Sequence, residues 1–129
     1  MRRAMPEEEN PFKGKRGLRR VWNAFHYSMD GLRSTYRSEE AFRQEVWLAV
    51  ILIPSSFFMP VSGIERAVMI ASVLIVLIVE LINSGIEAVV DRISPEKHPL
   101  SKQAKDVGSA AVLLALVNVA AVWGLILFG

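Results

Sequence analysis

The chain has 129 residues, of which 52% are hydrophobic, and its 15 Lys and Arg nearly balance 13 Asp and Glu for a formal net charge of +2. These charges cluster and leave long stretches almost uncharged, which is unlike a soluble domain. The lack of cysteine excludes a disulfide framework, a thiol nucleophile and a cysteine metal site, but leaves oxygen-ligated metals open. Three bilayer crossings of about 20 residues each would leave no room for a separate soluble catalytic domain. Composition therefore predicts a one-domain, all-α membrane protein.

Two different segments precede the apolar part of the chain. Residues 1–16 are charged and interrupted by prolines, so we expect a mobile tail, and the lack of an apolar region after the early arginines argues against a signal peptide. Residues 17–37 carry apolar side chains at three- and four-residue spacings, opposite a face rich in arginine. A basic amphipathic helix next to an apolar span is expected to lie in the headgroup plane. An ordinary core-facing helix is the alternative.

Three apolar segments follow. The first membrane span is predicted over about 41–61, and Pro54 should kink it by removing one helical hydrogen bond. The second span is predicted over about 66–91 and the third over 105–128, with a polar loop at 92–106 between them.

The distribution of Lys and Arg predicts the orientation in the membrane. Ten of these residues lie in the N-terminal region through Arg43, one lies in the turn between the first two spans, and four lie between the second and third spans. Basic residues concentrate on the cytoplasmic side of membrane proteins. We therefore expect the N-terminus and the second loop in the cytoplasm, and the C-terminus on the outer side.

The second span carries its polar side chains on one helical face. At 100° per residue, this face holds Glu80, Asn83, Ser84, Glu87 and Asp91. Carboxylates at membrane depth are costly and usually face a bundle interior, where they mark sites or ion paths. A helix that has already left the bilayer would account for Asp91, and less well for Glu87. It does not account for Glu80, which has apolar neighbours and lies about 10 Å deeper than Glu87.

The separation of these two carboxylates favours separate roles. Glu87, near the water boundary, suits a cation, and Glu80 suits a base. A hard divalent cation would need further oxygen ligands, which residues 38–45 can supply from the same side of the membrane. At the mouth of the third span, Lys105 either extends to the membrane surface or, beside Asp106, neutralises phosphate. Neither common glycine-rich nucleotide loop occurs in the sequence.

Three blocks of the chain are distinctive as a set. They are Glu-Ala-Phe-Arg-Gln-Glu at 40–45, Val-Glu-Leu-Ile-Asn-Ser at 79–84 with Glu87 and Asp91-Arg92, and Ala-Lys-Asp-Val-Gly-Ser-Ala-Ala-Val at 104–112. In order and spacing they resemble the prokaryotic integral-membrane diacylglycerol kinase family, from about Arg20 to the C-terminus. The resemblance implies a homotrimer in the bacterial inner membrane, built from three-span protomers with an interfacial N-terminal helix and shared active sites. It also implies transfer of the γ-phosphoryl group of magnesium-bound ATP to diacylglycerol, which yields phosphatidic acid.

The resemblance further implies roles for individual residues. Glu80 corresponds to the catalytic base and Asn83 to an essential polar partner, while Glu39 and Glu87 correspond to the metal-binding carboxylates. Nucleotide-contact positions are Arg20, Tyr27, Glu39, Glu87, Glu96, Lys97, His98, Lys105 and Asp106, of which 96–98 lie in a loop that closes over the nucleotide. Positions toward the lipid substrate are Arg43, Glu45, Glu80 and Ser109.

Three alternatives stay open. Relatives of the same fold phosphorylate undecaprenol, although the Asn-Ser after Glu80 and the Gly-Ser-Ala-Ala run at 108–111 look more like the diacylglycerol branch. A small ion-coupled transporter could use Glu80 as its ion carrier, but would leave Glu39, Glu87 and the pair at 105–106 without a role. A purely structural membrane subunit is the third alternative.

Overall fold

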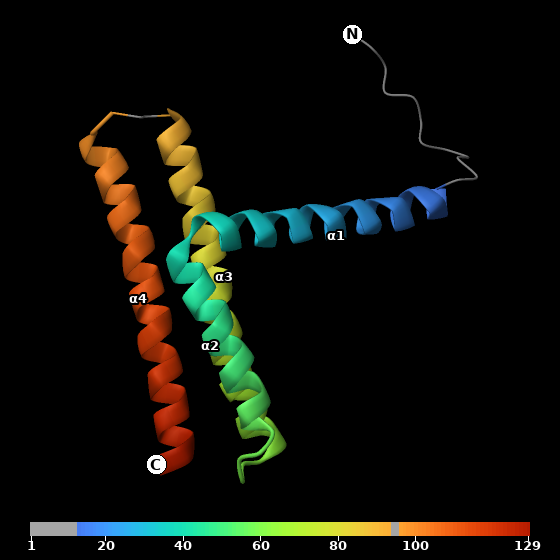
Figure 1. The fold of residues 1–129 in the computed structure, drawn as a ribbon, viewed down its shortest axis with the longest axis vertical. Coiled ribbons are helices and arrows are strands. Elements are labelled where there is room, and N and C mark those ends of the chain that lie inside the picture. The colour runs from blue at the N-terminus through green and yellow to red at the C-terminus, as the bar shows by residue number, and fades with distance from the viewer. Residues whose placement is uncertain (1–12, 94–95) are drawn as a thin grey trace. The chain divides into compact units, whose positions relative to one another are not determined.

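The computed structural model describes residues 13–93 and 96–129, and all regular structure in these ranges is helical, which confirms the predicted all-α class. The helices are, in chain order, α1 Lys13–Ser38, α2 Glu40–Ser56, α3 Gly63–Ile93 and α4 Pro99–Phe128 (Figure 1). The described residues divide into two units, with the boundary between Ser34 and Thr35.

The described part of the first unit is helical and belongs to α1. This helix begins at Lys13, four residues before its expected start, and residues 1–12 of the predicted tail lie outside the described residues. Its apolar stripe, which includes Val21, Trp22 and Phe25, is exposed. The rings of Trp22 and Phe25 stack, and His26 contacts both rings edge-on. An exposed apolar stripe is typical of a surface that binds a membrane or a partner, and the interfacial position of α1 stays a prediction.

In the second unit, α3 packs against both α2 and α4. A small core joins the three helices and contains Ala49 of α2, Met69 and Val73 of α3, and Trp123 of α4. The Trp123 indole Nε1 donates hydrogen bonds to the Met69 carbonyl oxygen and to Ser72 Oγ, each at 3.2 Å. Hydrogen bonds between helices stabilise packing where lipid supplies no hydrophobic driving force. The core therefore fixes how α3 and α4 lie against each other.

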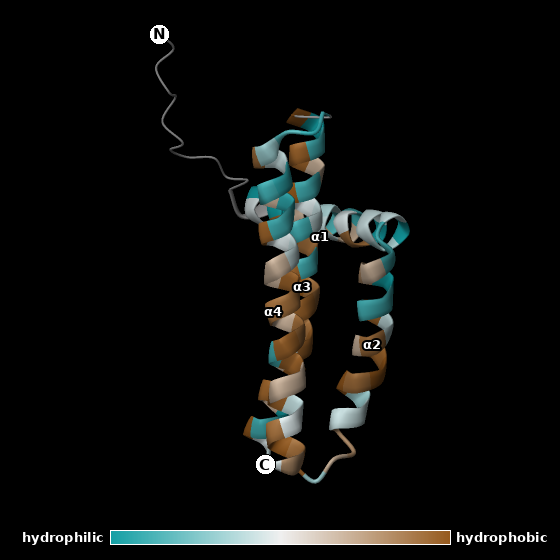
Figure 2. Ribbon diagram, turned by 90° about the vertical axis from the view of Figure 1, so that its left-hand side faces the viewer, coloured by the Kyte–Doolittle hydropathy of each residue, from teal (hydrophilic) through white to brown (hydrophobic). Residues whose placement is uncertain are grey.

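Of the described helices, α3 and α4 are long and apolar enough to cross a membrane. Figure 2 shows hydrophobic residues along the middle of both helices and hydrophilic residues at the ends that are joined to each other. By contrast, α2 has 17 residues, or about 25 Å of helix, and the hydrocarbon core of a bilayer is roughly 30 Å thick. The second and third predicted spans thus agree with the structure, and α2 as a further span stays a prediction.

The structure differs from the predicted end of the first span. The prediction extends to residue 61, whereas α2 ends at Ser56, and Pro54 lies in its last turn. The amides of the next three residues bond to carbonyls three positions back, a tighter spacing than in an α-helix. Ser62 and Glu65 then start α3 with a reciprocal cap, in which Glu65 Oε1 accepts from Ser62 N at 2.9 Å and Ser62 Oγ accepts from Glu65 N at 3.2 Å.

The structure also differs from the predicted polar loop at 92–106, because most of these residues are helical. The third helix extends to Ile93, and α4 already begins at Pro99. His98 caps α4 through Nδ1, which accepts a hydrogen bond from the backbone N–H of Leu100 at 3.1 Å. A proline in the first turn is favourable because the N–H that it lacks would have no helical partner there. The helix therefore starts six residues before the predicted third span, which begins at about 105.

Candidate functional site

Four glutamates gather around one buried position of α3. Glu80 is only 5% exposed, although it is an acidic residue in an apolar part of the helix. Its carboxyl group shares a hydrogen bond with that of Glu45 on α2, and the carboxylates of Glu39 and Glu87 lie close enough to act on its charge. A hydrogen bond between two carboxyl groups requires a proton on one of them. This pair of carboxyl groups can therefore hold one proton at a site shielded from water.

Asn83 lies between Glu80 and Glu87 on the same face of α3. It is 8% exposed, and its Nδ2 donates a hydrogen bond to Glu87 Oε1 at 3.4 Å. Three buried oxygens lack a hydrogen-bond partner among the described residues: Asn83 Oδ1, Ser84 Oγ and Glu45 Oε2. Buried polar atoms are normally paired, so these oxygens are available to a bound ion or substrate.

Burial along the polar face of α3 follows the predicted depth. Glu80 and Asn83 are buried, Ser84 and Glu87 are half-buried, and Asp91 is exposed. Burial within the protein thus decreases from Glu80 to Asp91 along this face, and the depth of these carboxylates in a membrane stays a prediction.

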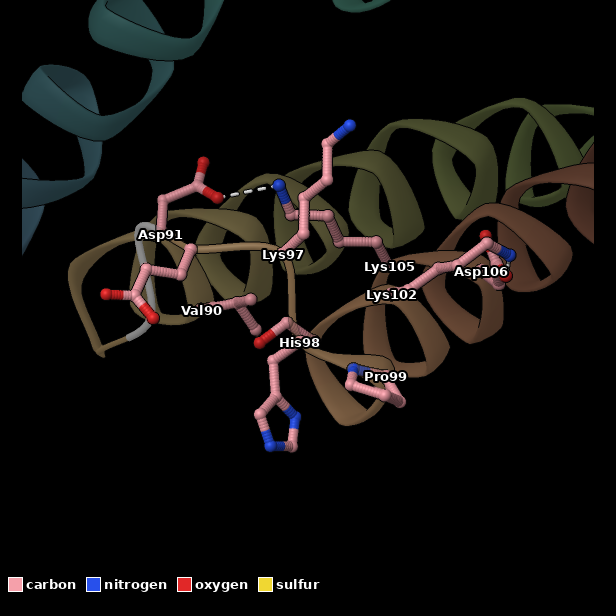
Figure 3. Close-up of a pocket in the computed structure, with 10 residues that line it drawn as sticks. Val90, Asp91, Lys97, His98, Pro99, Lys102, Lys105 and Asp106 are labelled. Carbon is pink, nitrogen blue, oxygen red and sulfur yellow. Dashed lines mark hydrogen bonds and ion pairs between the residues drawn. The ribbon is translucent and has the colours of Figure 1, made fainter.

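A cavity of about 710 Å³ lies where α3 ends and α4 begins (Figure 3). Its volume is in the range of pockets that bind small molecules. Charged and polar lining residues include Asp91, Glu96, Lys97, His98, Lys102, Lys105 and Asp106.

Two ion pairs organise this cavity. Lys105 Nζ on α4 lies 2.6 Å from Asp91 Oδ1 on α3, and Lys102 Nζ lies 2.6 Å from Asp106 Oδ2 one turn further along α4. The ring of His98 points away from the pair formed by Asp91 and Lys105 (Figure 3). The cavity thus presents ammonium groups beside carboxylates, an arrangement in which an incoming anion can replace one of the carboxylates.

The other predicted site residues have different surroundings. Arg20 and Tyr27 are exposed on α1, in the first unit. Arg43 is half-buried, and its Nη1 donates to two carbonyl oxygens at the end of α1, both at 2.8 Å. Ser109 is exposed on α4.

The sequence analysis did not assign two further residues, Lys102 and Gly108, to the site. Lys102 precedes Asp106 by four residues, a spacing that brings side chains together on a helix, but these residues were assigned to a loop. Gly108 lies directly against Asn83, because a Cβ atom at 108 would overlap the Asn83 amide oxygen. No sequence pattern reports that contact, since it depends on how α3 and α4 are aligned.

The carboxylate oxygens of Glu39 and Glu87 are suited to a divalent cation that binds together with phosphate. Among the described residues, no three or more His, Asp or Glu side chains are arranged to hold a metal ion by themselves. Mg²⁺ is usually held by one or two protein carboxylates together with substrate phosphates and water. Glu39 and Glu87 are two such carboxylates, and both lie close enough to act on the charge of Glu80. The donor set therefore fits magnesium bound together with a nucleotide.

Comparison with known proteins places the chain in a family. Residues 26–127 match the family model of prokaryotic diacylglycerol kinase. The diacylglycerol kinase of Pseudomonas aeruginosa is 56% identical over 120 residues, which cover 93% of this chain and 98% of that protein. Those of Haemophilus influenzae and Escherichia coli K12 are 53% and 45% identical, each over 112 residues that cover 87% of this chain and 95% and 92% of the relative, respectively. The predicted resemblance is confirmed: the chain belongs to the prokaryotic diacylglycerol kinase family.

Proposed function

We propose that this chain transfers the γ-phosphoryl group of magnesium-bound ATP to the free hydroxyl of diacylglycerol, yielding ADP and phosphatidic acid. The observation that carries this proposal is the burial of Glu80 among the carboxyl groups of Glu39, Glu45 and Glu87. A carboxylate at this depth suits the abstraction of a proton from a lipid hydroxyl, because a membrane lipid presents that hydroxyl at headgroup level, beneath the bulk water.

Glu80 acts as the general base. Its carboxylate accepts the hydroxyl proton while the hydroxyl oxygen bonds to the γ-phosphorus and the bond from that phosphorus to the β–γ bridging oxygen breaks. A positioned general base contributes about 10²- to 10⁴-fold in rate. Glu45 contacts the Glu80 carboxyl group from α2 and holds it in place.

Glu39 and Glu87 are the residues that would hold magnesium. When bound, the ion neutralises phosphate charge and aligns the phosphate oxygens. Asn83 orients Glu87 through the bond from Nδ2 to Oε1. Phosphoryl transfer needs positioning and charge stabilisation more than covalent chemistry by the protein, so this small set of residues is sufficient.

The nucleotide occupies the cavity at the ends of α3 and α4 in this proposal. Lys105 neutralises a phosphate group, exchanging its carboxylate partner Asp91 for the nucleotide. Asp106 keeps Lys102 in place through their ion pair. Further nucleotide contacts, assigned from the family resemblance, come from Glu96, Lys97, His98, Arg20 and Tyr27. Arg43 and Ser109 act toward the lipid substrate.

The proposed arrangement in the membrane completes this function. Residues 17–129 form one membrane-embedded kinase domain of the bacterial inner membrane, with α1 in the interface and α2, α3 and α4 as spans. The count of Lys and Arg on each side supports a cytoplasmic N-terminus and an outward C-terminus. Apolar side chains exposed along α4, such as Leu113, Leu114 and Val117, are suited to lipid or to other protomers of a homotrimer with shared sites.

Transfer of radiolabelled phosphate from magnesium-ATP tests the proposal. The full-length protein in mixed micelles is offered diacylglycerol and undecaprenol in separate reactions. Strong labelling of diacylglycerol is the expected result. Labelling of undecaprenol alone would keep the mechanism and change the substrate, and labelling of neither would refute the kinase in favour of an ion-coupled transporter.

A further inference from the structure

Gly108 makes room for a polar side chain from the neighbouring helix. It is buried on α4, and a Cβ atom at this position would overlap Asn83 Oδ1 and lie 3.0 Å from Asn83 Cγ. At five other glycines of the described helices, an added Cβ atom would meet nothing within 4 Å outside its own helix backbone; these are Gly17, Gly31, Gly63, Gly85 and Gly124. Among these described glycines, Gly108 is therefore the one whose missing side chain accommodates another helix.

The two ends of the Asn83 amide have different surroundings. Nδ2 donates to Glu87 Oε1 at 3.4 Å, while Oδ1 is buried, faces Gly108 and has no hydrogen-bond partner among the described residues. Asn83 is only 8% exposed, so its amide has little space in which to move aside. A side chain at 108 would therefore displace the amide, and with it the hydrogen bond to Glu87.

From this geometry we infer that Gly108 is a positioning residue for phosphoryl transfer. It allows the Asn83 amide to lie between α3 and α4, with Nδ2 on Glu87 and Oδ1 against Gly108. The inference rests on the proposed function, because it takes Glu87 as a magnesium ligand. Gly108 acts through Asn83 and has no contact with substrate of its own.

Gly108→Ala in the full-length protein tests this role, with Gly85→Ala and Gly124→Ala as matched controls. The controls make the same substitution on α3 and on α4 without an overlap. We expect Gly108→Ala to lower kcat about 10- to 100-fold, since small displacements of a positioned group are costly. It should also raise the magnesium concentration for half-maximal activity and leave the KM for diacylglycerol unchanged. The controls should stay within about two-fold of wild type.

The same substitution in an Asn83→Ser background distinguishes an effect on the position of Asn83 from a general effect on helix packing. Asn83→Ser removes the amide that the new methyl group would overlap, so adding Gly108→Ala to Asn83→Ser should cause no further loss of activity. A further 10-fold loss in that background would overturn the inference, because Gly108 would then act without Asn83. If Gly108→Ala alone fails to fold, Asn83→Ser should restore folding, and failure of the double variant to fold would also overturn it.

A readout other than activity distinguishes this inference from the proposed function. The rise in Tm that magnesium–ADP causes in detergent micelles should shrink in Gly108→Ala and persist in Gly85→Ala. A wild-type protein that shows this rise but labels no diacylglycerol would overturn the proposed function alone. Gly108→Ala with wild-type kinetics and a wild-type rise in Tm would overturn the inference alone.

Discussion

Glu80→Gln separates the base from the metal ligands of the proposed site. Glutamine has nearly the same shape and volume as glutamate, so it fills the same buried position, and its amide can still hydrogen-bond to Glu45. What it loses is the ability to accept a proton. We therefore expect folding and magnesium–nucleotide binding to persist while kcat falls by about 10²- to 10⁴-fold, or about 3 to 5 kcal/mol in the activation barrier.

Glu87→Gln should give the opposite pattern. Its amide oxygen can still accept the hydrogen bond from Asn83, but the negative charge that would hold magnesium is lost. We expect weaker binding of magnesium–ADP and a higher magnesium requirement. Initial rates of phosphate transfer in mixed micelles, together with titration calorimetry of magnesium–ADP, measure both effects.

Glu65→Gln provides a matched control at the other end of α3. Glu65 belongs to the cap that starts the helix, and glutamine serves in such a cap as well as glutamate does. Its kinetics and binding should match those of wild type. The division of labour is refuted if Glu80→Gln and Glu87→Gln lose nucleotide binding equally, or if Glu80→Gln keeps more than about a tenth of the wild-type kcat.

Lys105→Met should raise the KM for ATP about 10- to 150-fold, because a charged hydrogen bond to phosphate is lost. Asp91→Asn, which breaks the same ion pair from the other side, should change KM only a few-fold, and equal effects would mean that Lys105 serves only Asp91. If sites are shared, mixing Glu80→Gln subunits with Lys105→Ala subunits should give more activity at low ATP than either variant alone. No gain in mixed trimers, verified by a tag on each variant, would refute sharing. Trp123→Phe should lower the free energy of unfolding by about 0.6 kcal/mol, and at most about 1.7 kcal/mol, because the indole N–H that bonds to both Met69 and Ser72 is lost. Unfolding in detergent measures this loss, and a loss of several kcal/mol would mean that the indole acts mainly through packing.

Helix positions could largely be predicted from the sequence, whereas helix ends could not. Hydropathy locates the part of a helix that contacts lipid, and a helix can continue past that part into water. For this reason the prediction places the residues from Pro99 to about 104 in a loop, although a histidine cap and a first-turn proline start a helix there. The cap formed by Ser62 and Glu65 has a spacing that is recognisable in sequence, but it was not used in the prediction.

The candidate site was predictable within each helix, but between helices only coarsely: residues 38–45 were expected near the polar face of α3, without the individual contacts. The period of 3.6 residues places Glu80, Asn83 and Glu87 on one face of α3 whatever lies opposite them. Which residues of α2 and α4 meet that face depends on how the helices are aligned along their axes, and the apolar residues between them allow several alignments. The pair formed by Glu45 and Glu80 depends on that alignment, and so does the ion pair between Asp91 and Lys105.

The sequence by itself determined the helical class, the family and the polar face of α3, because each depends on local periodicity or on a linear pattern of residues. Only the tertiary structure decided that Gly108 lies against Asn83 and that Trp123 bonds to α3. These contacts join residues far apart in the chain, and they form only where the packing of whole helices brings two particular turns together.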